Sequence, residues 1–164
     1  MDTVKFIIEE YVDETEGFHF PTINIYINGV NLIDLVERVE NQNQALRGEQ
    51  TFRSAYIGLE PKYYRVLRGE FLGLQLRPLS LLLTCTCTIE LCNCILAKIA
   101  VDDKKVTWSE MICPWLGGKI TSPWLYEADA LAIGWVPYDY SSLGPFVFDR
   151  EQYMQALNQL EMEQ

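Results

Sequence analysis

The stretch from Leu79 to Trp108 constrains the fold more than any other part of the chain, because it is long and contains neither Gly nor Pro. Its segments Leu79–Cys87 and Cys92–Val101 are rich in Leu, Ile, Thr and Cys, a composition typical of β-strands. Asp102-Asp103-Lys104 predicts a tight polar turn, and Lys105–Trp108 predicts a third strand. Apolar side chains occur on both faces of this antiparallel meander, so we expect a central element that is covered on both sides.

Four of the five cysteines lie in this stretch, at Cys85, Cys87, Cys92 and Cys94. A hairpin with Thr88–Leu91 as its loop places Cys87 opposite Cys92 and Cys85 opposite Cys94. Because side chains alternate between the two faces of a strand, all four sulfur atoms would then share one face. Directly opposed Cβ atoms are about 4.5–5.5 Å apart, so the sulfur atoms would be close neighbours.

Three interpretations of these cysteines compete. Cysteine is often buried as a small hydrophobic residue, and reduced thiols without a cofactor need only the predicted register. Four thiolates are also the ligand set of a structural zinc site, although the usual spacing is C-x-x-C and this chain has C-x-C. Disulfides are disfavoured, because residues 1–10 lack a secretory signal and Cys113 makes the number of cysteines odd. Buried thiols are the leading interpretation, and zinc is the alternative.

Composition limits the classes of function. The 164 residues, 49% hydrophobic and 22% charged, predict a single globular domain spanning 1–164. The 23 acidic and 13 basic residues give a formal charge of −10, which argues against binding to nucleic acid or to anionic membranes. No apolar run approaches the roughly 20 residues of a membrane span. We therefore expect a cytoplasmic, acidic protein.

The N-terminal third predicts two strands followed by a helix. Val4–Val12 is a candidate strand, and Thr22–Asn28 alternates cleanly between apolar and polar residues. Asn28-Gly29 predicts a turn, after which Asn31 is a plausible N-cap for a helix that runs to about Glu40. The polar segment Asn41–Arg53 predicts a loop.

The C-terminus carries the clearest local pattern. Asp149 with Gln152 three residues later matches a capping box, and Phe148 and Tyr153 occupy the two positions of a hydrophobic staple. These signals predict a helix over Arg150–Met162. Together, the patterns predict an α+β domain with a central antiparallel sheet around residues 79–108 and two or three packed helices.

Acidic residues gather at the end of the first predicted strand and directly after it, at Glu9, Glu10, Asp13, Glu14 and Glu16. Such a group could bind a hard cation, but its spacing matches no known loop motif, so we interpret it as a solvated strand end and turn. His19 is the only histidine and hence the only histidine base for a catalytic triad. No G-x-S-x-G, G-x-G-x-x-G or phosphate-binding loop motif is present.

Aromatic residues and helix breakers are concentrated between Pro114 and Gly144. Long ordered loops are often functional, and Trp and Tyr are enriched at interfaces. We therefore expect a non-enzymatic binding module that contacts a protein partner, or a second copy of itself, through Trp115, Trp124, Tyr126 and Trp135. The alternatives are a small structural-zinc protein and an enzyme whose catalytic groups follow no recognised motif.

Two segments resemble an uncharacterised bacterial protein family. The first is the C-x-C…C hairpin followed by Val106-Thr107-Trp108 and Pro114, and the second is Y-S-S-L-G-P-F-V-F-D-R at residues 140–150 with Gln152-Tyr153 behind it. Family members look like C-x-C-G-x-x-G-C-W in the hairpin and have Q-P-H-R after the V-x-W strand. This chain has Thr88 and Leu91 in place of the glycines and C-P-W-L at residues 113–116 in place of Q-P-H-R. The family has no established function, so the resemblance implies only a shared fold over roughly residues 79 to 160.

Overall fold

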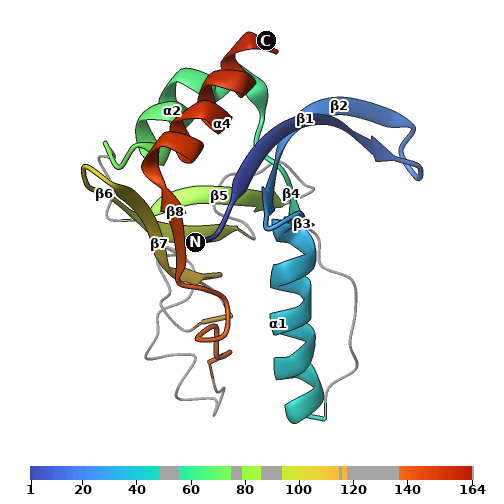
Figure 1. The fold of residues 1–164 in the computed structure, drawn as a ribbon. Coiled ribbons are helices and arrows are strands. Elements are labelled where there is room, and N and C mark those ends of the chain that lie inside the picture. The colour runs from blue at the N-terminus through green and yellow to red at the C-terminus, as the bar shows by residue number, and fades with distance from the viewer. Residues whose placement is uncertain (49–55, 75–78, 86–93, 115, 118–136, 164) are drawn as a thin grey trace.

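The computed structural model describes residues 1–48, 56–74, 79–85, 94–114, 116–117 and 137–163. These residues form two antiparallel sheets, in the orders β1-β2-β3 and β4-β5-β6-β7-β8, with helices packed around them (Figure 1). The predicted α+β class and the central antiparallel meander are confirmed. The strands are β1 (Val4–Asp13), β2 (Phe18–Ile27), β3 (Val30–Asn31), β4 (Tyr56–Ile57), β5 (Ser80–Cys85), β6 (Ile95–Val101), β7 (Lys105–Ile112) and β8 (Phe146–Asp149). The helices are α1 (Leu32–Leu46), the short 3-10 helix η1 (Pro61–Tyr63), α2 (Tyr64–Phe71) and α4 (Arg150–Met162).

The register of the central hairpin differs from the prediction. Leu83 of β5 pairs with Ile95 of β6, whereas placing Cys85 opposite Cys94 requires Leu83 opposite Leu96. The register shifts between Leu81 and Leu83, which inserts one extra residue into β5. Because a shift of one residue moves a side chain to the opposite face, the shared face predicted for Cys85 and Cys94 does not follow from this register.

The smaller sheet forms as its alternation predicts. Ile23, Ile25 and Ile27 of β2 are buried, and the intervening side chains face the other way. The turn after β2 is built by Asn28 at φ 52° and Gly29 at φ 81°, the two consecutive left-handed residues that a type I′ turn requires. This geometry explains why the Asn-Gly pair leads directly into β3.

Helix α1 begins where it was predicted but ends later. The Asn31 side chain accepts a hydrogen bond from the Ile33 amide at 2.9 Å, which caps the first turn. The helix continues to Leu46, so the loop predicted from Asn41 is wrong for its first six residues. The polar side chains there suit a helix, and Gln44 among them is buried by tertiary packing that the sequence pattern did not reveal.

Helix α4 spans the predicted residues Arg150–Met162. The Asp149 carboxylate accepts from the Gln152 amide at 3.0 Å, and the rings of Phe148 and Tyr153 lie 5.7 Å apart, as a staple requires. The Gln152 side chain does not complete the capping box. It donates to the Val4 carbonyl at 2.7 Å and accepts from the Val4 amide at 3.2 Å, which ties α4 to the start of β1.

An aromatic cluster holds the two sheets and two helices together. Its five rings come from β1, α2, β7, β8 and α4, and they belong to Phe6, Phe71, Trp108, Phe148 and Tyr153. The indole N–H of Trp108 donates to the Tyr153 hydroxyl at 3.3 Å, and that hydroxyl donates to the Phe71 carbonyl at 2.7 Å. Both polar groups are thereby satisfied inside the core, where an unpaired donor is costly.

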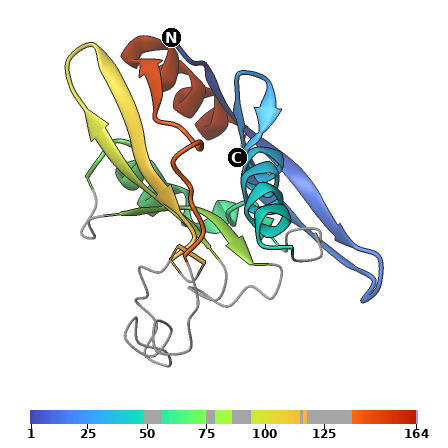
Figure 2. The ribbon, with the colours of Figure 1, turned by 90° about the horizontal axis from the view of Figure 1, so that it is seen from below.

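The two sheets meet where β2 approaches the segment after β4. The backbones of Ile23 and Leu59 exchange two hydrogen bonds, at 2.6 and 3.0 Å. Gly58 makes this approach possible, because a Cβ at that position would lie 2.4 Å from the Ile23 carbonyl oxygen. Beyond this junction the β1–β2 hairpin projects away from the rest of the molecule, as both views show (Figures 1 and 2).

Candidate functional site

The outer half of the β1–β2 hairpin, residues 9–22, is the part of the molecule that we assign as the candidate functional site, and we call it the arm. Its ladder runs from Glu9 paired with Thr22 to Asp13 paired with Phe18. The same hairpin is buried nearer its base, where Val4 and Phe6 face the aromatic core. The arm continues the ladder beyond the residues that the core covers (Figure 1).

The turn at the end of the arm has a defined shape. The Asp13 carboxylate accepts hydrogen bonds from the amides of Thr15 and Glu16, at 2.9 and 3.0 Å. The Gly17 amide donates to the Asp13 carbonyl at 2.9 Å, and Gly17 adopts φ 74°, which favours glycine. Asp13 therefore organises the turn through its own side chain and backbone.

The arm exposes large apolar side chains. Val12 is 57% exposed and Phe18 is 41% exposed. The Phe18 ring stacks on Phe20 with centroids 5.9 Å apart, and Phe20 lies 5.3 Å from the ring of Tyr11. These three aromatic side chains share the face of the hairpin that points away from the isoleucines of the core. The contacts order the rings without covering them.

A hollow of about 700 Å³ lies between the arm, the first turn of α1 and β4. Four acidic residues line it, and none of the described residues around it is basic. Its acidic residues come from both β1 with its turn and α1, and they are Glu10, Asp13, Glu14 and Asp34. Such a surface attracts cationic groups and repels phosphates.

One side of the hollow is fixed by a small hydrogen-bonded group. The Tyr26 hydroxyl and the Asn24 amide both donate to Oε1 of Glu9. The hydrogen bond to Glu9 and partial burial raise the pKa of Tyr26. On the opposite face of the hairpin, His19 Nδ1 contacts the Glu10 carboxylate, and both side chains are mostly exposed. His19 thus lies in the arm beside an acid, and within the described residues it contacts no serine or cysteine nucleophile.

A second cluster, separate from the arm, surrounds the buried Glu40 of α1. Its Oε2 accepts a hydrogen bond from the Tyr56 hydroxyl at 2.8 Å and from the Tyr140 hydroxyl at 2.6 Å. Burial raises the pKa of Glu40 above its ordinary value, and the two phenol donors partly oppose that shift. The cluster links three segments that are far apart in sequence.

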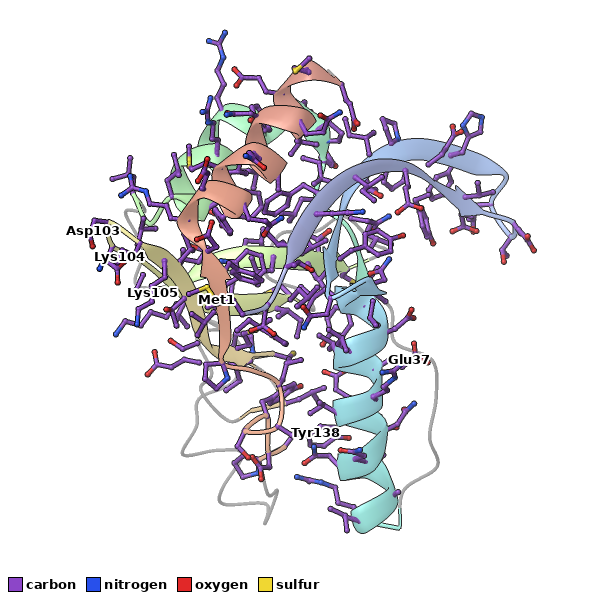
Figure 3. The ribbon with its side chains drawn as sticks, viewed as in Figure 1. Met1, Glu37, Asp103, Lys104, Lys105 and Tyr138 are labelled. Atoms are coloured by element: carbon purple, nitrogen blue, oxygen red, sulfur yellow. The ribbon has the colours of Figure 1, made fainter. Side chains whose placement is uncertain are left out.

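Further contacts along α1 strengthen this link. The Asn43 side chain donates to the Asp139 carbonyl at 2.9 Å and accepts from the Asp139 amide at 2.7 Å. The guanidinium of Arg47 lies 4.4 Å above the ring of Tyr138. Figure 3 shows Tyr138 beside α1, and it shows Glu37 on the other side of the helix. One oxygen of Glu40 accepts hydrogen bonds from both tyrosines and thereby joins their two segments to α1. We therefore interpret the cluster as structural and call it the clamp.

The structure tests few of the site residues predicted from the sequence. Cys85, Cys94 and Cys113 are buried thiols, and Cys87 and Cys92 lie outside the described residues. Within the described ranges no group of three or more His, Cys, Asp or Glu side chains is placed to hold a metal ion. The predicted zinc alternative, which needs all four cysteines of the hairpin, therefore stays a prediction. The four predicted partner-binding aromatics also lie outside the described residues, at Trp115, Trp124, Tyr126 and Trp135.

The sequence did contain a signal for the arm. The acids of residues 9–16 were interpreted as a solvated turn, but Val12 and the Phe18-x-Phe20 pair flank that turn. Apolar side chains at both ends of an acidic turn are unexpected for a purely solvated one. Where the core ends relative to these side chains depends on the length of β1 relative to α4, and no local sequence pattern contains that information.

Comparisons of the chain with known protein families, curated proteins and solved structures found no match. No family model matches the chain, and no curated protein or solved structure matches it. The resemblance of residues 79–160 to an uncharacterised bacterial family therefore stays a prediction. Among the helices in the described part of the chain, none combines the length and apolar character needed to cross a membrane.

Proposed function

We propose that this protein is a non-enzymatic binding module that uses the arm to hold a basic protein partner. The observation that carries this proposal is the exposure of Val12 and Phe18 at the end of a projecting hairpin with a well-defined turn. Burial of exposed apolar surface contributes roughly 25 cal/mol per Å², which favours covering these side chains with a partner. A preorganised arm also loses little conformational entropy on binding.

Charge supports a protein partner with a basic surface. Acids crowd the arm and the hollow beneath it, and the chain carries a formal charge of −10. Nucleic acids would be repelled by such a surface, because their recognition depends on basic groups that neutralise phosphates. A basic protein surface would instead be attracted to it and steered toward the arm.

The remaining expectations are part of the same proposal. We propose a cytoplasmic protein that folds as one domain over residues 1–164, with Trp115, Trp124, Tyr126 and Trp135 as a further partner-binding surface. The structural-zinc alternative has its own test, which is elemental analysis of protein purified without chelator. One zinc per chain, with unfolding on chelation, would support it.

Site-specific cross-linking tests the arm directly. A photo-reactive phenylalanine analogue replaces Phe18 in the full-length chain, which is produced in its native cells. A matched probe replaces Leu46, which is 88% exposed at the far end of α1. We expect one defined partner to be cross-linked from position 18 and not from position 46.

Direct binding of the purified partner completes the test. Reversing the charge of Glu10 and Glu14 to Lys should weaken binding by about tenfold or more, because both are acidic residues of the arm that line the hollow. The Asp103→Lys control makes the same kind of change at the β6–β7 turn, on the opposite side of the molecule (Figure 3), and should leave binding unchanged. Identical cross-linked products from both positions, or products containing only a second copy of the chain, would refute the proposal.

A further inference from the structure

The outer edge of β1 along the arm presents unpaired backbone groups. Ile23 directs its N–H and C=O away from β1, toward Leu59, so its partner Ile8 directs its own backbone groups away from β2. Val4 does the same, since both of its backbone groups are bonded to the Gln152 side chain. Because this direction alternates along a strand, Ile8, Glu10 and Val12 all point to the outer edge.

These outward groups have no hydrogen-bond partner in the described part of the chain. Val4 is bonded to Gln152 near the start of β1, but no backbone or side-chain bond reaches the N–H or C=O of Ile8, Glu10 or Val12. Glu10 and Val12 are exposed, so their backbone groups are accessible to a partner. Such an edge is a template for the addition of another strand.

The opposite edge of the arm is less suited to pairing. On β2 the residues that point outward beyond Ile23 are Pro21 and His19, by the same alternation. Proline has no N–H to donate, so a strand added there would lack a hydrogen bond at its centre. The two edges of the arm therefore differ, and only that of β1 offers a continuous row of donors and acceptors.

Symmetric pairing with a second copy of the chain is unfavourable along the arm. In a symmetric antiparallel pair of β1 edges, residues equidistant from the centre lie directly opposite each other. Every register centred on residues 9 to 12 then opposes two carboxylates, and directly opposed like charges are destabilising. A centre at residue 9 opposes Glu9 with Glu9, and a centre at residue 10 opposes Glu10 with Glu10. A centre at residue 11 opposes Glu9 with Asp13, and a centre at residue 12 opposes Glu10 with Glu14.

We propose that an extended, Lys- and Arg-rich segment of the partner adds to the sheet as a strand along Ile8–Val12 of β1. This inference rests on the proposed function and specifies how the arm is used. Basic side chains of the added strand pair with Glu9 on one face of the hairpin and with Glu10 on the other. Apolar residues beside Ile8 and Val12 cover the apolar side chains on that face of β1.

Synthetic seven-residue peptides test the inference with the full-length protein. The probe is Lys-Val-Thr-Lys-Arg-Val-Thr, whose second, fourth and sixth residues lie opposite Val12, Glu10 and Ile8 in an antiparallel register. A second peptide carries backbone N-methyl groups at those three residues, which removes the donors facing β1 and keeps the charge. A third carries N-methyl groups at the first, third and fifth residues, whose amides face away from β1.

Fluorescence anisotropy measures the affinities of the three peptides. We expect the unmodified and the outward-methylated peptides to bind, and the peptide methylated toward β1 to bind at least about tenfold more weakly. Amide hydrogen exchange supplies a second measurement. Binding should slow exchange at Ile8, Glu10 and Val12 by about tenfold or more, with little change at Glu9 and Tyr11, which already pair with β2.

Variants of Val12 test the edge from the protein side. Val12→Pro removes an outward N–H that has no partner within the described residues, and should abolish peptide binding. Val12→Thr keeps the N–H and the β-branched shape, so it should bind the unmodified peptide normally. Circular dichroism of both variants checks that the hairpin is intact, and the methylated peptides decide the matter if Val12→Pro does not fold.

Three results would overturn the inference. Equal binding of all three peptides would show that charge alone attracts them, and absence of any binding would show that this chemistry is not recognised. Protection of the Ile8, Glu10 and Val12 amides by raised protein concentration alone would assign the edge to a second copy. None of these results depends on the cross-linking from Phe18, so a failure here is distinguishable from a failure of the proposed function.

Discussion

Replacing Glu40 by Gln should remove a pH dependence from the stability of this protein. Burial raises the pKa of Glu40 in the folded state above its ordinary value of 4.5, which is the value expected in the unfolded chain. Between these two pKa values the folded state retains a proton that the unfolded state has lost. The free energy of unfolding therefore falls as the pH rises through this window.

The magnitude follows from the exchange of a single proton. One proton corresponds to a slope of at most about 1.4 kcal/mol per pH unit, and only within that window. The glutamine side chain of the E40Q variant cannot ionise, but its carbonyl oxygen can accept the hydrogen bonds that Tyr56 and Tyr140 now donate. We expect E40Q to match the wild type within about 1 kcal/mol below the window and to be the more stable protein above it.

Urea denaturation at several pH values from about 4 to about 8 measures this difference, provided that the m-values agree. Glu14→Gln is the matched control, because Glu14 is exposed in the turn of the arm and takes no part in the hydrogen bonds between Glu40 and the two tyrosines. The control removes one carboxylate without touching the two tyrosines. If the stability of E40Q and wild type changes in parallel with pH, burial does not raise the pKa of Glu40 in the folded state.

Two further changes test the construction of the fold. Gly58→Ala should destabilise the protein by about 1–3 kcal/mol, because the new Cβ would lie 2.4 Å from the Ile23 carbonyl oxygen. The control is Gly69→Ala within α2, which should be neutral or stabilising because its Cβ would meet nothing closer than 3.9 Å. Equal effects of the two substitutions in urea denaturation would contradict the close approach at Gly58. Asp149→Ala should lower the free energy of unfolding by about 0.5–2 kcal/mol because it removes the N-cap of α4, whereas Asp149→Asn should retain most of the stability. Equal melting temperatures of the two variants would argue against the cap.

Local sequence patterns predicted the elements whose causes are local. The N-caps Asn31 and Asp149, the Asn28-Gly29 turn and the alternating isoleucines of β2 all form as predicted. Each depends on backbone geometry or on a side-chain period within a few residues, and such preferences are carried by the residues themselves. The antiparallel meander at the centre is predictable for the same reason, since short polar turns join neighbouring strands.

Tertiary structure decided what the local patterns left open. The sequence placed Glu40 at the end of a helix, but its burial depends on Tyr56 and Tyr140 arriving from distant segments. Gln152 has the right spacing for a capping box, yet it binds the backbone of Val4, because β1 begins beside α4.

The arm shows the same division between local and tertiary causes. Its first strand and its acidic turn were predicted from local patterns, whereas its second strand was predicted only from Thr22 and in fact begins at Phe18. Whether the edge of β1 is paired, covered or open depends on how far the rest of the chain extends along it. Hydrogen bonds between strands join residues that are far apart in sequence, so only the folded chain determines which backbone groups remain available to a partner.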